Sequence, residues 1–323
     1  MQEGRNSNFP ENLNISPSQR PDEVDPGLDS VLDAYSQKDA IEKYGIAGRV
    51  WEAAYILLSY MQGSPKWELD PPFLSSTTKR NTYLELGSGT GVVGIKLTQI
   101  LAPDDLVILT DLPDVCSLLR ETLERHGLQE TTICSDWSGG LIVRPLPWGD
   151  PEYALSIAAD LGLTSHSKAD SSRYLTRIIC SDLVYFPELL APLLRSLIQL
   201  SSPPFVPEGR PWDLEVVISY KIRSLPKETP FWSAFGLWFT FHPVIVRPRG
   251  DTDASGDTWR RLGSSIGEDG CFVFIARRRA ESFTWSIPES DSDLLSGHGT
   301  PWSSDEQFET FLLSAFDDNE TDL

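Results

Sequence analysis

Short apolar runs alternate with helical patterns through most of the chain. Each short run has the apolar content of a buried strand, and the segment after it carries apolar residues at every third or fourth position, as on one face of a helix. Strands that alternate with helices build an α/β fold with a parallel, doubly wound sheet. The expected strands are "TYLELG" (82–87), "DLVILTDL" (105–112), "TTICSDW" (131–137) or "LIVRPLPWG" (141–149), "RIICSDLVY" (177–185), "LEVVISYKI" (214–222), "FTFHPVIVRP" (239–248) and "CFVFIARRR" (271–279).

The expected helices lie between these strands, and one precedes them. Glycine or proline ends several of the patterns, as at Gly63 and Gly127, because these residues disfavour continuation of a helix. The helical segments are "GIAGRVWEAAYILLSYMQG" (45–63), "GVVGIKLTQILA" (91–102), "VCSLLRETLERHG" (115–127), "ELLAPLLRSLIQL" (188–200) and "PFWSAFGLWF" (230–239).

The two ends of the chain differ from this middle part. Residues 1–30 form a polar and acidic arm with few large apolar residues, so we expect it to be disordered. The folded domain is expected over 31–285. Residues 286–323 form an acidic tail, in which 305–316 place Phe308, Phe311, Leu312, Ala315 and Phe316 on one face of an amphipathic helix. Three interpretations stay open for this segment: a helix packed on the domain, a helix that folds on a partner, or disorder.

Composition narrows the function classes. The formal net charge of −20 argues against unaided binding to nucleic acid or to an anionic membrane, and it suits a basic protein partner. The four cysteines and four histidines are scattered without metal-ligand spacing, so we expect no metal. The sequence has no signal-peptide pattern and no apolar run of membrane-spanning length, which predicts a cytoplasmic or nuclear protein. We also expect a monomer.

The glycine-rich turn "YLELGSGTGVVG" (83–94) fits two cofactor classes. Gly89, Gly91 and Gly94 match the dinucleotide pattern G-x-G-x-x-G. Glu85 and Gly87 begin an acidic-x-Gly-x-Gly-x-Gly turn. This second pattern suits a positively charged sulfonium cofactor with an amino-acid end, which the carboxylate helps to orient. A pyrophosphate would be repelled by that carboxylate.

Carboxylates also end two further strands. Asp111 follows the second strand, where it can accept hydrogen bonds from ribose hydroxyls of either cofactor. Asp182 and Tyr185 end the strand "RIICSDLVY" and therefore face the same crevice as the glycine turn. If the cofactor is the sulfonium compound, its electrophilic methyl group lies beside this carboxylate and phenol, and the three together make a site for an amine.

Several segments in order carry a resemblance to a known family. They are "GRVWEAAYILLSYM", "LELGSGTGVVGI", "VILTDLPDVCSLL", "LPWGD", "SDLVYFPELLAPLL", "VISYKIRS" and "FVFIARRR", which together cover about residues 45–280. The chain resembles the methyltransferase family 16 group of protein-lysine methyltransferases, which use S-adenosylmethionine. The resemblance implies a Rossmann-like, seven-stranded, mostly parallel sheet with flanking helices.

The resemblance also implies roles for individual residues. Asp182 and Tyr185 are expected as the catalytic D-x-x-Y pair, with Asp182 orienting the acceptor amine. Asp111 is expected to bind the ribose, and Trp148 to lie beside the adenine. Ser181 stands where many relatives carry alanine, and a small side chain there allows main-chain contact with the cofactor. The expected cofactor-binding residues are Trp51, Glu85, Gly87, Ser88, Gly89, Asp111, Trp148 and Ser181.

The function that the resemblance implies is methylation of a lysine side chain in a folded non-histone protein, such as a translation elongation factor or a chaperone. Three alternatives stay open at this point. One is a small-molecule amine N-methyltransferase, and another is a non-catalytic cofactor-binding module whose tail recruits a partner. The third, a dinucleotide oxidoreductase, lacks a recognisable hydride-transfer constellation.

Overall fold

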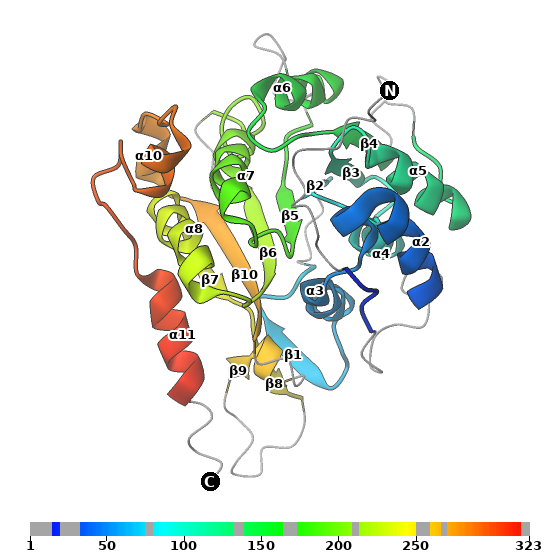
Figure 1. Cartoon of the computed structure of the whole chain (residues 1–323), viewed down its shortest axis with the longest axis horizontal. Coiled ribbons are helices and arrows are strands. Elements are labelled where there is room, and N and C mark those ends of the chain that lie inside the picture. Colours follow the sequence, from blue (N-terminus) through cyan, green and yellow to red (C-terminus); the bar gives the residue numbers. More distant parts are fainter. Residues whose placement is uncertain are drawn as a thin grey trace.

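The computed structural model describes residues 15–19, 33–74, 80–131, 139–163, 173–208, 213–249, 259–265 and 270–317. Its central sheet has seven strands in the order β4-β3-β2-β5-β6-β10-β7 (Figure 1). Pairing is parallel from β4 to β6, whereas β10 runs antiparallel to both of its neighbours. The expected doubly wound, mostly parallel sheet is therefore confirmed. Its strands are β2 (Thr82–Leu86), β3 (Leu106–Asp111), β4 (Gly140–Pro145), β5 (Arg177–Ser181), β6 (Glu215–Lys221), β7 (Phe239–Pro243) and β10 (Cys271–Arg278).

Helices cover both faces of this sheet (Figure 1). Successive strand side chains point to opposite faces, so Leu84 packs into one hydrophobic core and its neighbour Tyr83 into the other. The Tyr83 side is covered by α3 (Glu52–Gln62), α4 (Val92–Ile100) and α5 (Cys116–Arg125). The Leu84 side is covered by α6 (Pro151–Asp160), α7 (Pro187–Leu200) and α8 (Leu225–Trp238). Burial on both faces explains why the strand sequences are apolar at nearly every position.

A second, three-stranded sheet was not expected. It consists of β1 (Trp67–Asp70), β8 (Ile245–Pro248) and β9 (Arg260–Arg261), all antiparallel, with α9 (Leu262–Ser265) directly after β9. The expected strand over 239–248 is thus divided between the two sheets, at Val244. Of the two candidates for the strand after α5, 141–149 matches β4, and residues 132–138 lie outside the described part.

The amino-terminal side contributes a short packed segment. Residues 15–19 lie within the arm expected to be disordered, yet Ser18 is buried at 6% exposure and its hydroxyl lies 2.7 Å from that of Tyr55. Helix α2 (Ala34–Tyr44) and the 3₁₀ turn η2 (Gly45–Gly48) then lead into α3. Residues 1–14 and 20–32 fall outside the described ranges.

The carboxy-terminal side packs on α8. After β10 come the 3₁₀ turn η5 (Ala280–Thr284), α10 (Asp291–Leu295) and α11 (Gln307–Asp317). Phe308 is fully buried and stacks on Trp232 with ring centroids 4.8 Å apart. These contacts match the interpretation of a helix packed on the domain. The expected positions Ala315 and Phe316 belong to α11, but their side chains are outside the described part.

Three further findings concern the described residues alone. No helix among them is long and apolar enough to cross a membrane. Within the same ranges, no three His, Cys, Asp or Glu side chains are grouped so that they could hold a metal ion. Cys116, Cys180 and Cys271 are buried free thiols.

Candidate active site

A cavity of about 410 Å³ lies at the carboxyl ends of β2, β3 and β5. Parallel strands bring their carboxyl ends to one edge of a sheet, and the loops that follow them form the walls. All of the site residues expected from the sequence line this one cavity. They are Trp51, Glu85, Gly87, Ser88, Gly89, Asp111, Trp148, Ser181, Asp182 and Tyr185.

The glycine turn between β2 and α4 forms the floor of the cavity. Gly87 and Gly89 have positive φ values of 58° and 52°, which favour glycine. A Cβ on Gly87 would come within 2.9 Å of Leu183 and 3.0 Å of Trp148, and one on Gly89 within 3.0 Å of the Ala47 carbonyl oxygen. The turn therefore lets the backbone approach a ligand where any side chain would be crowded.

Two buried carboxylates face the cavity from β2 and β3. Burial raises the pKa of Glu85 to about 8, and nearby Asp111 adds to this effect. The Oε2 atom of Glu85 is buried without a hydrogen-bond partner. Burial likewise raises the pKa of Asp111 to about 6, although its carboxylate accepts hydrogen bonds from the backbone N–H groups of Gly89 and Leu112, each at 2.8 Å.

These two acids restrict the kind of ligand that fits. A buried acceptor without a partner is costly unless a ligand supplies a donor. S-adenosylmethionine carries such donors, namely an ammonium group and two ribose hydroxyls, as well as a positive charge. The pyrophosphate of a dinucleotide would instead add negative charge beside both carboxylates. The residues present thus fit S-adenosylmethionine better than the dinucleotide that the glycine pattern alone allowed.

Aromatic rings form the walls. The indole N–H of Trp51 donates to the Ile46 carbonyl at 3.0 Å, which fixes the ring at the start of α3. Trp148 and Tyr185 meet edge to face with centroids 6.5 Å apart. Burial raises the pKa of the Tyr185 phenol above its usual value, so it stays protonated at neutral pH. These three rings therefore add apolar, uncharged surface to a cavity that charged side chains line elsewhere.

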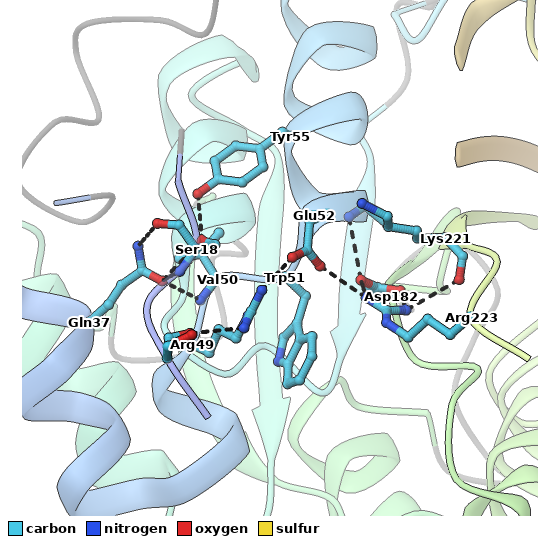
Figure 2. A network of polar contacts seen from close by, with 12 residues as sticks. Ser18, Gln37, Arg49, Val50, Trp51, Glu52, Tyr55, Asp182, Lys221 and Arg223 are labelled. Atoms are coloured by element: carbon cyan, nitrogen blue, oxygen red, sulfur yellow. Dashed lines mark hydrogen bonds and ion pairs between the residues drawn. The ribbon is translucent and has the colours of Figure 1, made fainter. Parts of the chain in front are cut away.

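Asp182 has a role in the ion pairing of the site that the sequence did not reveal. Its side chain is fully buried, and it pairs with Arg223 from the loop after β6. Arg223 also pairs with Glu52, which in turn pairs with Arg49 (Figure 2). None of these three partners was expected as a site residue. A signal did exist: a buried carboxylate needs a cation, and "KIRS" follows the strand next to β5.

Fold and cavity together define a Rossmann-like α/β protein with a cavity at the carboxyl ends of its parallel strands. The profile of the lysine methyltransferase family matches residues 35–234. Because this match covers more than half of the chain, the protein belongs to the lysine methyltransferase family.

Individual relatives are more distant. The chain is 25% identical over 169 residues to protein-lysine N-methyltransferase EFM6 of Saccharomyces cerevisiae. This aligned region covers 50% of this chain and 62% of that protein. The match therefore spans less than two thirds of the relative's length. Among solved structures, the human methyltransferase 10 domain containing protein is 11% identical, with 77% of this chain and 94% of that chain covered and a TM-score of 0.36. Ribosomal protein L11 methylase of Lactobacillus delbrueckii subsp. bulgaricus is 15% identical, with coverages of 63% and 73% and a TM-score of 0.33. TM-scores this low support no statement about function.

Proposed function

We propose that the protein is an S-adenosylmethionine-dependent N-methyltransferase that acts on a lysine side chain of another, non-histone protein. The observation that carries this proposal is the single cavity in which the glycine turn, the two buried acids and the Asp182–Tyr185 edge meet. Membership of the lysine methyltransferase family and the likeness to a protein-lysine N-methyltransferase support it.

In this proposal the cofactor is held by the β2 and β3 ends of the cavity. Gly87, Ser88 and Gly89 approach its methionine part through their backbone, Glu85 accepts from its ammonium group, and Asp111 accepts from its ribose. Bound S-adenosylmethionine supplies a methyl group that leaves its sulfonium for the neutral ε-amine of lysine.

The chain's own residues would then prepare the acceptor amine. Lysine has a pKa near ~10.4 in water, so the site must favour loss of a proton before transfer. The apolar walls of Trp51, Trp148 and Tyr185 would desolvate the amine, which lowers its pKa. The Tyr185 ring stabilises the methylated ammonium product through cation–π attraction. Alignment of amine and methyl group provides most of the rate.

The acceptor protein is a finer part of the proposal. A net charge of −20 suits a lysine-rich surface on the partner. The sequence resemblance implies a translation elongation factor as one such acceptor.

The test is transfer of label from radioactive S-adenosylmethionine to proteins of a cell extract, with the D182N variant as a control. Asparagine keeps the shape of Asp182 and tolerates its positive φ of 61°. We expect a labelled protein band with the wild type and loss of at least about 90% of the label with D182N, because the acceptor amine loses the carboxylate that we propose aligns it. Cofactor binding to D182N is measured separately by calorimetry.

Other outcomes point to the other classes. Label that appears only in small molecules would indicate a small-molecule amine methyltransferase. Cofactor binding without any label transfer would indicate a binding module. Equal labelling by the wild type and D182N would remove Asp182 from the catalytic site.

A further inference from the structure

Asp182 is held with little freedom at the end of β5. It is the non-glycine residue with positive φ among those described, at 61°, and its backbone N–H donates to the Ser219 carbonyl at 2.8 Å. Its side chain is fully buried. Oδ1 accepts from Arg223 Nη1 at 2.6 Å, while Oδ2 accepts from Arg223 Nη2 at 2.5 Å and from the Ala53 N–H at 3.4 Å. Both carboxylate oxygens are thus already bound within the protein.

Arg223 connects three elements at this point. Besides Asp182, its Nη2 donates to Glu52 Oε2 at 3.2 Å, and its Nη1 to the Lys221 carbonyl at 3.2 Å. Its guanidinium carbon lies 5.3 Å from the Trp51 ring centroid. Burial lowers the pKa of Arg223, but the pairing with Asp182 and Glu52 raises it more, so the guanidinium keeps its charge. Arg223 is therefore a permanent cation against Asp182.

A second arginine completes the group. Arg49 pairs with the other oxygen of Glu52, and its guanidinium carbon lies 4.7 Å from the Trp51 ring centroid (Figure 2). Burial raises the pKa of Glu52, but its own backbone N–H and the nearby Arg49, Lys221 and Arg223 lower it more. Two acids and two arginines thus form a cluster whose formal charges cancel.

Further charged groups surround the cluster. The positive charge of Lys221 from β6 lowers the pKa of Glu52. The negative charges of Glu188 in α7 and Asp111 in β3 raise the pKa of Tyr185, which lines the cavity together with Asp182. Glu85 faces the cavity from β2. Of the residues that the structure describes, Arg223 alone meets Asp182 through both carboxylate oxygens, so removal of Arg223 changes the charge at Asp182 most directly.

We propose that Arg223 is a positioning residue that fixes Asp182 and cancels its charge, so that the acceptor amine can lose its proton at a lower pH. The inference rests on the proposed lysine methyl transfer. An unpaired carboxylate beside a lysine stabilises the ammonium form and raises its pKa. A carboxylate already neutralised by a guanidinium no longer opposes deprotonation of an amine beside it. The pairing thereby reconciles a carboxylate at the acceptor with a reaction that needs a neutral amine.

The experiment compares pH profiles of methyl transfer by R223Q, R223K, E52Q and the R223Q/E52Q double variant. The probe is tritium-labelled S-adenosylmethionine at saturating concentration, and the acceptor is the strongest labelled protein band of a cell extract. Saturation keeps the Glu85 and Asp111 region in its cofactor-bound state. Calorimetric binding of S-adenosylmethionine and thermal unfolding verify that each variant is folded.

The proposal predicts that removal of a positive charge and removal of a negative charge shift the pH profile of methyl transfer in opposite directions. R223Q leaves the cluster one unit more negative, so the alkaline rise of the rate should move up by roughly one to three pH units. R223K keeps the charge and should stay nearer to the wild type. E52Q leaves the cluster one unit more positive and should move the rise to lower pH, and the double variant should return it toward the wild-type position.

A merely structural role for Arg223 would give a different result. In that case R223Q would slow the reaction by the same factor at every pH, without a shift, and the proposal would be overturned. Should R223Q fail to fold, E52Q decides, since a profile that does not move to lower pH also overturns it. Failure of the proposed function looks different again, because the wild type would then label no protein at all.

Discussion

The cavity has two halves that treat negative charge in opposite ways. In the half that we propose for the cofactor, Glu85 and Asp111 are buried with hydrogen bonds, neither is paired with an arginine or lysine of the described residues, and burial raises the pKa of both. In the half that we propose for the acceptor amine, Asp182 and Glu52 are paired with arginines. The first half therefore suits a ligand that brings hydrogen-bond donors and positive charge. In the second half the formal charges of the paired side chains cancel, so in our proposal it would hold an amine without stabilising the ammonium form.

The largest expected effect concerns Glu85 and the pH dependence of stability. The folded protein keeps this proton up to about pH 8, whereas the unfolded chain releases it near the ordinary glutamate pKa of 4.5. Stability therefore falls as the pH rises through this window. The E85Q variant lacks the titration and should be more stable than the wild type by about 2 to 5 kcal/mol above pH 8.

Urea unfolding at several pH values checks this prediction. The stability difference between E85Q and the wild type should grow with pH and then level off. Saturating S-adenosylmethionine should reduce the slope of the wild type, because its ammonium group stabilises the ionised carboxylate. Parallel curves for the two proteins at all pH values would show that Glu85 is ionised in the folded state without a ligand, and the contrast between the halves would disappear.

The second prediction separates the halves by cofactor affinity. The D111N variant loses a charged acceptor for the ribose hydroxyls, which should weaken S-adenosylmethionine binding roughly ten- to hundredfold. The matched control is D182N, whose affinity should stay within about threefold because Asp182 is already bound by Arg223. Titration calorimetry measures both. Equal weakening in the two variants would mean that the cavity does not divide its carboxylates between cofactor and acceptor.

The sequence indicated which residues meet in the proposed cofactor half better than in the proposed acceptor half, for a physical reason. Glu85, the glycines and Asp111 lie at the ends of consecutive strands, so the βα alternation places them together. The partner of Asp182 depends instead on how a loop after β6 folds back, and the two residues are 41 positions apart in the sequence. Adjacent parallel strands bring the loops to one edge, but they do not determine which of several arginines meets the carboxylate.

Local patterns also missed the second sheet. Strand β1 has four residues and pairs with β8 across 179 positions, as in the pair Glu68 and Arg247. Such short strands carry too few residues to show a periodic pattern, and their pairing is decided by the packing around them. Helix α6 was missed as well, although Asp150 caps it by accepting from the N–H groups of Glu152 and Tyr153.

The smallest expected effect concerns the contacts that join the amino-terminal segment, residues 15–19, to the paired half of the cavity. The Ser16 carbonyl accepts from Arg49 Nη1 at 2.8 Å, and the Ser18 hydroxyl contacts Gln37 Oε1 at 3.1 Å and Tyr55. Gln37 Oε1 also accepts from the Val50 N–H, so the segment is joined to the residues beside Trp51. The S18A variant should lower the free energy of unfolding by about 1 kcal/mol, because it removes the hydrogen bonds that the buried Ser18 hydroxyl makes with Gln37 and Tyr55. S16A removes only an exposed hydroxyl and keeps the carbonyl, so it should change stability by less than about 0.5 kcal/mol. Urea unfolding of both variants decides, and equal losses would indicate that the buried Ser18 contacts do not anchor the segment.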